Sequence, residues 1–318
     1  MLVLVTGAAG FIGSHLCEAL AGAGHQVRAV DAFTPYYDVR QKEANAAVLA
    51  NELGIEVQRA DLASCSLAPL MEGVDVVLHQ AGQPGVRASW REGFEAYVEA
   101  NILVTQRLLE ASVGSSVGRF VYASSSSVYG AAAAYPTSED DLPRPQSPYG
   151  VTKLAAEHLC GVYARNFGVS TVSLRYFTVF GPRQRPDMAM HRMIEAAIAG
   201  TPFPMFGDGS QIRDFTYVAD VVRANVLAMT APAVEPATVL NVAGGTSVSL
   251  GEVVRTVGEL IGRPVPVDRR PGEAGDVHRT GGSTARIGDV LGWKPETGLR
   301  DGLARQVEWH EERVPTRG

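Results

Sequence analysis

The sequence predicts an α/β protein with a doubly wound parallel sheet and a smaller α/β lobe toward the C-terminus. Three observations support this fold class. Short apolar runs alternate with helical stretches through the first half of the chain, a glycine-rich turn joins the first run to the first helix, and the composition shifts after Tyr176 toward Gly, Pro, Arg and Asp. Strands that alternate with helices form a parallel sheet covered by helices on both faces.

The individual elements follow in order from the hydrophobic pattern. Leu2–Val5 is expected to be a strand, and the helix Ser14–Ala23 that follows it ends at Gly24. Further strands are expected at Val27–Val30, Ile55–Arg59, Val74–His79, Arg119–Ala123 and Val169–Tyr176. Helices are expected at Phe94–Ser112, Tyr149–Phe167 and Val218–Ala228, a returning strand at Val239–Val242, and short helices mixed with Pro-rich loops from residue 249 to 318.

This order suggests two units within the 318 residues. Residues 1–176, joined by 217–245, are expected to form the sheet domain. Residues 177–216 and 246–318 are expected to form the smaller lobe. A chain of this length suits one large domain or two fused ones.

Composition and charge exclude several classes of protein. The net charge is -6 with mixed signs along the chain, whereas nonspecific nucleic-acid binding needs a basic face. No apolar run reaches the ~20 residues of a membrane span, and the N-terminus lacks the basic region of a signal peptide. The spacing of Cys17, Cys65 and Cys160 indicates neither a disulfide framework nor a zinc site. We therefore expect a cytoplasmic protein without a metal that binds neither nucleic acid nor membrane.

The turn Gly7-Ala-Ala-Gly10-Phe-Ile-Gly13 has the spacing GxxGxxG and joins the first strand to the first helix. Gly7 permits a tight turn, Gly10 lets backbone amides approach a pyrophosphate, and Gly13 allows close helix–strand packing. The helix N-terminus, with Phe11 and Ile12, favours the anion. A glycine triplet alone also occurs in ordinary turns, but this position indicates a Rossmann-type dinucleotide site.

Two carboxylates follow later strands of the predicted sheet. Asp31 stands eighteen residues after Gly13 at the end of the second strand, where a carboxylate accepts both ribose hydroxyls and repels a 2′-phosphate, which favours NAD over NADP. The alternative is that Asp31 caps a turn. Asp61 and Leu62 follow the third strand and are expected beside the adenine, although a capping role explains Asp61 equally well.

Tyr149 and Lys153 lie four residues apart and share one face of the predicted helix. A free tyrosine has a pKa near ~10, and a nearby ammonium group together with a positive nicotinamide ring would lower it. Lys153 would also hold the nicotinamide ribose. Tyr and Lys at this spacing also occur by chance on ordinary amphipathic helices, so the pair gains meaning only from its combination with other motifs.

A serine run supplies that combination, in the segment Val121-Tyr-Ala-Ser-Ser-Ser-Ser-Val-Tyr-Gly130. The glycine turn, Asp31, the serine run and Tyr-x-x-x-Lys together resemble the extended short-chain dehydrogenase/reductase family, in its NAD-dependent epimerase/dehydratase group. The resemblance covers nearly the whole chain, including 213–220 and 241–245. It implies a catalytic triad of Ser125, Tyr149 and Lys153, a cofactor-lining strand end at Ala81 and Gly82, and a homodimer through the helices near 94–112 and 149–167.

Within that family the serine run also separates the reactions. Dehydratases carry an Asp-Glu pair before Val-Tyr-Gly, and UDP-glucuronate decarboxylases usually carry a Glu at the second of these positions. Here the positions hold Ser126 and Ser127, so the acid and base that dehydration needs are missing. Epimerisation or simple redox chemistry remains.

The segment from Arg175 to Met188 resembles UDP-glucuronate 4-epimerases. It carries Thr178 where UDP-glucose epimerases typically have Asn, and it ends in Arg-Pro-Asp-Met. The segments 83–89 and 31–38 resemble the same branch, and Pro84 and Gln184 depart from its pattern. A 4-keto glucuronate loses carbon dioxide readily, so an epimerase must restrain the C6 carboxylate. Thr178, with Arg185 or Arg87, is expected to do so, although either arginine can instead serve the diphosphate or the fold.

The resemblance implies further contacts to a UDP-sugar. Ser126 and Met188 are expected to touch the substrate, Arg213 and Arg270 to clamp the diphosphate, Asp276 to bind the uridine ribose, and Phe206 within Phe203–Phe206 to contact the uracil. A Pro-rich structural loop is the alternative for that last segment. A UDP-glucuronate decarboxylase, a neutral UDP-hexose 4-epimerase and, more remotely, a nonenzymatic NAD-sensing regulator remain alternative functions.

Overall fold

The computed structural model describes residues 1–232, 234–272 and 277–313. At its centre is a seven-stranded sheet with the order β11-β6-β5-β4-β1-β2-β3, in which every neighbouring pair is parallel. Its strands are β1 (Leu2–Thr6), β2 (Gln26–Asp31), β3 (Val57–Arg59), β4 (Val76–His79), β5 (Arg119–Ser125), β6 (Thr171–Tyr176) and β11 (Thr238–Val242). The α/β class with a doubly wound parallel sheet is thereby confirmed.

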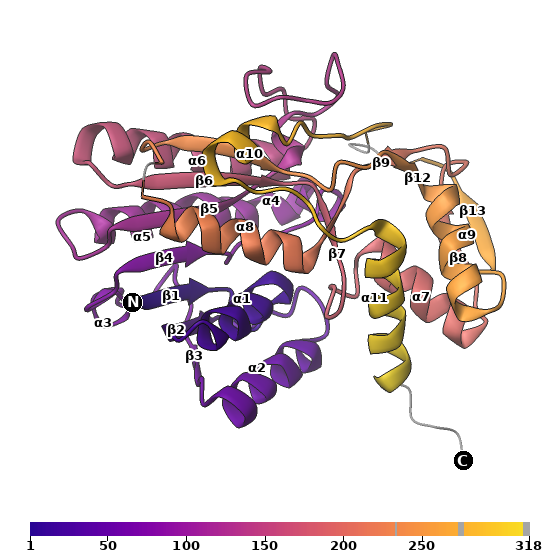
Figure 1. Ribbon diagram of the computed structural model, residues 1–318, viewed down its shortest axis with the longest axis horizontal. Helices are drawn as coiled ribbons and strands as arrows, with labels where there is room; N and C mark the ends of the chain where they lie inside the picture. The colour runs from indigo at the N-terminus through magenta and orange to yellow at the C-terminus, as the bar shows by residue number, and fades with distance from the viewer. Residues whose placement is uncertain (233, 273–276, 314–318) are drawn as a thin grey trace.

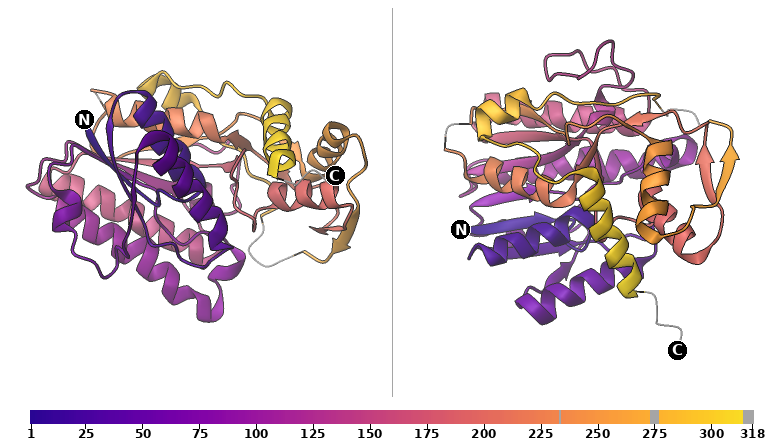
Figure 2. Two further views of the ribbon diagram at one scale, coloured as in Figure 1. Left: turned by 90° about the horizontal axis from the view of Figure 1, so that it is seen from below. Right: turned by 45° about the vertical axis from the view of Figure 1, so that its right-hand side comes forward.

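Helices cover both faces of this sheet (Figures 1 and 2). One face carries α1 (Phe11–Gly22), α2 (Val39–Leu53) and α8 (Val218–Thr230), with α10 (Ala285–Leu291) beside α8; the other carries α3 (Ala68–Met71), α5 (Val104–Ser112) and α6 (Pro148–Phe167). Residues of β1 alternate between two apolar cores, because Val3 and Val5 join one cluster and Leu4 joins the other. This alternation follows from the period of two along a strand.

The smaller lobe lies beyond the carboxyl ends of the strands, where Figure 1 shows it on the right. It holds the two-stranded sheets β10-β7, β12-β9 and β13-β8. Its strands are β7 (Thr178–Phe180), β8 (Phe203–Phe206), β9 (Ile212–Arg213), β10 (Phe215–Tyr217), β12 (Val248–Ser249) and β13 (Val267–Arg270). Three mutually packed helices complete it: α7 (Ala189–Ala199), α9 (Leu250–Ile261) and α11 (Leu299–Arg313).

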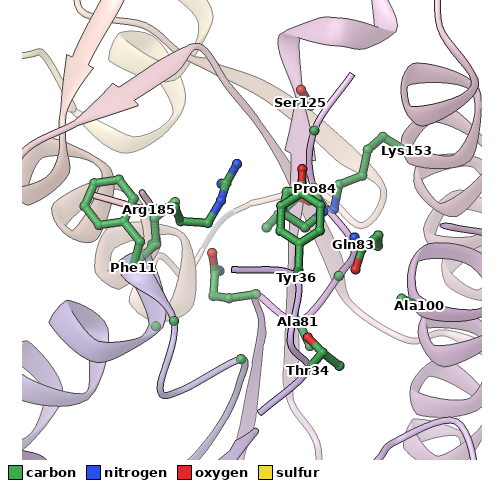
Figure 3. A pocket seen from close by; sticks show the side chains of 18 of the residues that line it. Phe11, Thr34, Tyr36, Ala81, Gln83, Pro84, Ala100, Ser125, Lys153 and Arg185 are labelled. Carbon is green, nitrogen blue, oxygen red and sulfur yellow. Dashed lines mark hydrogen bonds between the residues drawn. The ribbon is translucent and has the colours of Figure 1, made fainter. Parts of the chain in front are cut away.

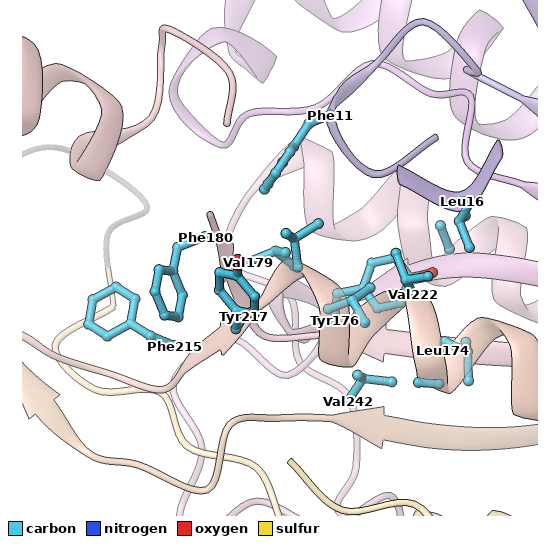
Figure 4. Close-up of a cluster of buried hydrophobic side chains, with 14 of the residues drawn as sticks. Phe11, Leu16, Leu174, Tyr176, Val179, Phe180, Phe215, Tyr217, Val222 and Val242 are labelled. Atoms are coloured by element: carbon cyan, nitrogen blue, oxygen red, sulfur yellow. The ribbon is translucent and has the colours of Figure 1, made fainter. Parts of the chain in front are cut away.

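One apolar cluster runs without interruption from the sheet into the lobe (Figure 4). Phe180 packs edge-on against Phe215 and Tyr217, with ring centroids 6.3 and 5.6 Å apart. Leu174 and Val242 of the sheet belong to the same cluster. Because this core is continuous, the lobe is held at a fixed place over the strand ends. The division into a sheet domain and a discontinuous lobe at the residues given above stays a prediction.

Most predicted elements are present with shifted ends, and three features differ from the expectation. The hydrophobic pattern did not indicate α2 and α7. The predicted helix 94–112 is divided into α4 (Phe94–Tyr97), the π-helical turn η3 (Val98–Leu103) and α5, and it is preceded by the 3₁₀ turns η1 (Arg87–Ser89) and η2 (Arg91–Gly93). Helices α9 and α11, with 12 and 15 residues, are longer than the short helices expected there.

None of the helices in the described part of the chain combines the length and the apolar character that a membrane-spanning segment requires.

Candidate active site

A cavity of about 470 Å³ opens at the carboxyl ends of the parallel strands. It lies where the strand order reverses, since the chain runs from β1 to β2 and β3 on one side and from β4 to β6 on the other. Ligands of doubly wound sheets bind at this kind of switch point. Figure 3 shows Arg185 and Lys153 reaching into the cavity from opposite sides.

The glycine turn forms the floor of this cavity. Gly7 has a positive φ of 69°. The Ala81 backbone lies so close to it that a Cβ added at Gly7 would be 2.9 Å from the Ala81 nitrogen. A Cβ at Gly13 would lie 2.1 Å from the Gly7 carbonyl oxygen. Gly10 caps α1 without a side-chain hydrogen bond, so the first amides of the helix, at Phe11 and Ile12, are available to an anion.

Asp31 is held in place at the end of β2 by three donors. Its carboxylate accepts hydrogen bonds from the Phe33 amide at 2.7 Å, the Ala9 amide at 3.2 Å and the Lys42 ammonium group at 3.2 Å. The side chains of Asp31 and Lys42 are both buried. An ionised carboxylate has about four acceptor sites, so one remains on Asp31 for a ribose hydroxyl.

Asp61 and Leu62 also line the cavity, on the turn after β3. The Asp61 carboxylate accepts a hydrogen bond from the Ala63 amide at 2.9 Å, and Arg107 donates to the carbonyl groups of Leu62 and Cys65. Asp61 therefore fixes its own turn and also lines the cavity, and its place beside the adenine stays a prediction. Ala81 and Gly82, at the end of β4, complete this half of the lining.

These residues fit a bound dinucleotide. Three features of the cavity suit NAD. They are glycines at which an added Cβ would collide with backbone atoms, a helix N-terminus without a side-chain cap, and a fixed carboxylate at the end of β2. Gly7, Gly10, Gly13 and Asp31 would hold the pyrophosphate and the adenosine ribose.

The three residues of the proposed triad also line this cavity. Ser125 ends β5, whereas Tyr149 and Lys153 project from the first turns of α6. The Ser147 hydroxyl caps α6 by accepting from the Gly150 amide at 3.1 Å, which fixes the helix start. Ser125 lies beside Tyr149 and lowers its pKa, and the Lys153 ammonium group donates to the Ala123 carbonyl oxygen at 2.9 Å.

The pKa of Tyr149 differs from the sequence expectation. Burial raises it, although Ser125 and the charge of Arg185 act in the opposite direction. We expected Lys153 to lower this pKa, but the protein groups that lower it are Ser125 and Arg185. Burial lowers the pKa of Lys153 itself to about 8. In the protein alone, Tyr149 is therefore a neutral phenol at neutral pH.

The residues proposed for the sugar carboxylate lie beside Tyr149. Ser126, Thr178, Arg185 and Met188 all line the cavity. The Arg185 guanidinium pairs with Asp187 through Nε and Nη2, each 3.0 Å from a carboxylate oxygen. A guanidinium has five N–H donors, so three remain for a second anion.

Arg87, which was proposed for the sugar carboxylate, is not among the residues that line this cavity, and neither are Phe206, Arg213 and Arg270, which were proposed for the nucleotide. Arg87 lies over the Phe206 ring, 4.0 Å from its centroid, and Phe206 is the register partner of Arg270 in the β8–β13 pair. Arg270 also pairs with Asp268 at 2.9 Å. Arg213 donates to the carbonyl oxygens of Ile212 and His278 at 2.9 and 3.2 Å. Asp276 lies outside the described residues.

Sequence reasoning missed several residues of the cavity. Tyr36 and Gln83 line it. The Tyr97 hydroxyl supports the loop after Gln83, because its single hydrogen is shared between the carbonyl oxygens of Pro84 and Gly85, both 2.8 Å away. Asn101, on the π-helical turn, accepts from the Gln83 amide at 2.8 Å. Lys42 could have been singled out from the sequence, because it is one of only three lysines.

Comparison with known proteins agrees with this geometry. The model of the NAD dependent epimerase/dehydratase family matches residues 3–243. An uncharacterized UDP-glucose epimerase of Bacillus subtilis is 42% identical over 310 residues, covering 97% of this chain and 98% of its own. The UDP-glucuronic acid 4-epimerase of Bacillus cereus, solved with UDP-glucuronic acid and NAD, is 40% identical with a TM-score of 0.95, covering 98% and 99% of the two chains.

A further solved relative, MoeE5 in complex with UDP-glucuronic acid and NAD, is 46% identical with a TM-score of 0.88, again covering 98% and 99% of the two chains. The chain belongs to the NAD dependent epimerase/dehydratase family. Within that family it is an NAD-dependent nucleotide-sugar 4-epimerase, with NAD as its cofactor.

Proposed function

We propose that the protein is a UDP-glucuronate 4-epimerase, which interconverts UDP-glucuronate and UDP-galacturonate. The observation that carries this proposal is that Thr178 and Arg185 line the same cavity as Tyr149, so a hydroxyl donor and a cation face the reacting sugar. A neutral hexose has no anion at C6 that would use this cation. The relatives from Rhizobium meliloti and Thermodesulfobacterium geofontis, 36% and 34% identical, are named as UDP-glucuronate 4-epimerases.

Tyr149 would take the proton of the C4 hydroxyl group as a phenolate, the form that the positive charge of bound NAD favours. Ser125, which lies close enough to Tyr149 to lower its pKa, would share that proton between the sugar and the phenol through its hydroxyl group. Lys153, held by the Ala123 carbonyl oxygen, would orient the nicotinamide ribose. When bound, NAD supplies the hydride chemistry, in which a hydride leaves C4 and later returns to it. The 4-keto sugar turns about its diphosphate link between these steps, and Tyr149 then returns the proton.

Arg185 and Thr178 would decide what happens to the carboxylate. The 4-keto sugar is a beta-keto acid, and it loses carbon dioxide when the C5–C6 bond lies parallel to the carbonyl pi system. Each charged hydrogen bond contributes roughly 1.5–3 kcal/mol, and ~1.4 kcal/mol changes a rate tenfold. Two such contacts are enough to hold the carboxylate in a rotamer that does not decarboxylate.

The nucleotide end is proposed to lie along Phe206 and the arginines Arg87, Arg213 and Arg270. Arg87 and Phe206 stack at 4.0 Å, and a cation on an aromatic face offers both charge and an apolar surface. Arg270 stands on β13, the partner strand of β8, and Arg213 stands on β9 in the separate pair β12-β9. We propose that the arginines contact the diphosphate and that Phe206 contacts the uracil.

A second function has a specific observation in its favour. MoeE5 has also been solved with UDP-glucose and NAD, at 45% identity, and the Bacillus subtilis relative is named as a UDP-glucose epimerase. A neutral UDP-hexose 4-epimerase is therefore the main rival. A UDP-glucuronate decarboxylase is the next, and Ser126 and Ser127 disfavour it because neither is an acid or a base at neutral pH.

Product analysis by NMR separates these functions. Wild-type protein is incubated with UDP-glucuronate and, separately, with UDP-glucose. We expect UDP-galacturonate as the product of the first and at most slow turnover of the second. Pentose with carbon dioxide release would establish the decarboxylase, and faster turnover of UDP-glucose would establish the neutral epimerase. Thr178→Asn is expected to raise the pentose fraction from UDP-glucuronate.

We also propose a homodimer through α6 and the segment α4–η3–α5. Both carry apolar side chains that face solvent in the single chain, with Val98, Leu103, Val151 and Val162 between 37% and 48% exposed. Such exposed apolar groups on neighbouring helices mark contact surfaces. Light scattering is expected to give a dimer for wild type and a monomer for Leu103→Glu, and a monomeric wild type would rule the dimer out.

A further inference from the structure

A cluster of two histidines and a glutamate lies where α7 packs against α11, away from the active-site cavity. His191 and Glu195 stand one turn apart on α7, and His310 is in the last turn of α11. One ligand atom from each residue lies within 4.8 Å of the others. In the described part of the chain, none of the three lines the cavity that holds Tyr149.

The hydrogen bonds of His191 fix which of its nitrogens faces the cluster. Its Nδ1 lies 2.7 Å from the Gln184 carbonyl oxygen, and a carbonyl oxygen only accepts, so Nδ1 carries the hydrogen. In the neutral ring Nε2 then holds a lone pair, yet it faces a Glu195 carboxylate oxygen at 3.1 Å. Two acceptors at this distance repel each other unless a cation, either a proton or a metal ion, lies with them.

His310 supplies a second and independent observation. Its side chain is only 5% exposed, and its Nε2 has no hydrogen-bond partner among the residues that the structure describes. A buried polar atom left in this state costs free energy and calls for an explanation. The unprotonated nitrogen of a neutral imidazole can donate its lone pair to a metal ion.

We propose that His191, Glu195 and His310 bind a divalent transition-metal ion, with Zn²⁺ as the best match. Two imidazoles and one carboxylate form a ligand set that suits zinc, with metal–ligand distances of about 2.0–2.2 Å. The Glu195 side chain is 59% exposed, so it can rotate to complete the geometry and leaves the fourth position to water. Magnesium is disfavoured because it prefers oxygen ligands.

The hydrogen bonds of Gln184 connect the proposed metal site to both helices. The Gln184 carbonyl oxygen accepts from the His191 ring, and its side-chain oxygen accepts from the His191 amide at 3.0 Å and from Gln306 of α11 at 2.9 Å. A metal–ligand histidine is commonly oriented by a carbonyl in this way. The ion would tie α7 to α11 beside the loop that carries Arg185, so its role is structural and not catalytic.

The test uses the full-length protein with NAD bound, stripped of metal with a chelator and then transferred to chelator-free buffer. Zn²⁺ is titrated by calorimetry, and bound metal is counted by elemental analysis. We expect one Zn²⁺ per chain and a rise in Tm that Mg²⁺ does not produce. Co²⁺ at the same site is expected to give visible absorption of a tetrahedral nitrogen–oxygen centre.

Two variants and one matched control assign the site. Glu195→Ala removes an exposed ligand without disturbing the core, and it is expected to weaken Zn²⁺ binding at least tenfold. His310→Gln is expected to abolish binding. Glu308→Ala, which removes an exposed carboxylate from the same helix α11, is expected to bind like wild type. Epimerase activity of Glu195→Ala is expected to stay unchanged.

The proposal is overturned if wild type takes up no Zn²⁺, or if Glu195→Ala binds it as tightly as wild type does. Because Glu195 is exposed, this second comparison remains decisive even if His310→Gln does not fold. The outcome is independent of the substrate, so failure of this proposal leaves the proposed epimerase function intact.

Discussion

The cofactor half and the substrate half of the cavity are built in different ways. The cofactor half consists of turns at the ends of adjacent strands, where Gly7, Gly13 and Asp31 are fixed by backbone contacts. The substrate half consists of side chains brought together from β7, α6 and the loop before α7, among them Thr178, Tyr149 and Arg185. Changes in the first half should therefore affect the fold and NAD together, whereas changes in the second should alter chemistry in an intact protein.

Gly13→Ala is expected to give the largest effect. The new Cβ would lie 2.1 Å from the Gly7 carbonyl oxygen and 2.8 Å from its carbon, and backbone atoms cannot move aside cheaply. We expect loss of bound NAD together with a lower Tm, measured by cofactor content and thermal unfolding. Gly22→Ala, at the other end of α1 with no atom within 4 Å, is the matched control and should change neither.

Tyr149→Phe tests the substrate half. Loss of general acid–base catalysis typically costs 10²–10⁴-fold in rate, so we expect kcat to fall by about this factor while NAD content and Tm stay close to wild type. Tyr163→Phe on the same helix, whose hydroxyl bonds Glu110 outside the cavity, serves as control. Retention of full activity by Tyr149→Phe would contradict the assignment of this residue.

Lys153 connects the two halves, and its burial predicts a dependence of stability on pH. Its pKa falls from 10.5 to about 8 in the folded protein, so between these values the unfolded chain binds more protons and stability rises with pH. The cost of burying the charge is present below pH 8 and is relieved as the pH increases toward 10.5.

The matched variant for this effect is Lys153→Met, which lacks the titrating group. The free energy of unfolding of wild type relative to this variant should therefore increase between about pH 8 and pH 10, by up to roughly 3 kcal/mol on the scale of 1.36 kcal/mol per pKa unit. Urea unfolding at matched NAD saturation measures it. A difference that is flat or decreasing with pH would show that Lys153 is charged in the folded protein throughout.

Arg185→Leu is expected to give the smallest of these effects, and the most selective. Arg185 also lowers the pKa of Tyr149, so its loss should slow both substrates. Removing a charged hydrogen bond of roughly 1.5–3 kcal/mol should in addition lower kcat/KM for UDP-glucuronate about tenfold to a hundredfold more than that for UDP-glucose. The ratio of the two values, followed by NMR, is the measurement. An equal loss for both substrates would mean that Arg185 acts through Tyr149 or the diphosphate and not through the carboxylate.

The same contrast explains what could be predicted from the sequence. The glycine turn, Asp31 and the Tyr149–Lys153 pair depend on local spacing, and all of them line one cavity in the structure. Lys42 and Asn101 were missed because their roles depend on contacts across 11 and 18 residues, with Asp31 and Gln83. The π-helical turn that carries Asn101 has no hydrophobic period of its own, so the pattern around it predicts an ordinary helix.

The lobe was the least predictable part for a related physical reason. Its strands are two to four residues long, too short for a hydrophobic period to be recognised. The stacking of Arg87 on Phe206 joins η1 to β8 across more than a hundred residues. The zinc site proposed between α7 and α11 could not be predicted from sequence spacing either. His191 and Glu195 show helical spacing, but the third ligand, His310, comes from a distant helix.

A crystal structure of the protein with NAD and UDP-glucuronate tests the central claim most directly. The account predicts the Tyr149 hydroxyl within ~2.6–3.2 Å of the sugar's O4, with the C6 carboxylate hydrogen-bonded to Thr178 and Arg185. A sugar whose fourth carbon lies away from Tyr149, or whose carboxylate meets neither side chain, would contradict it.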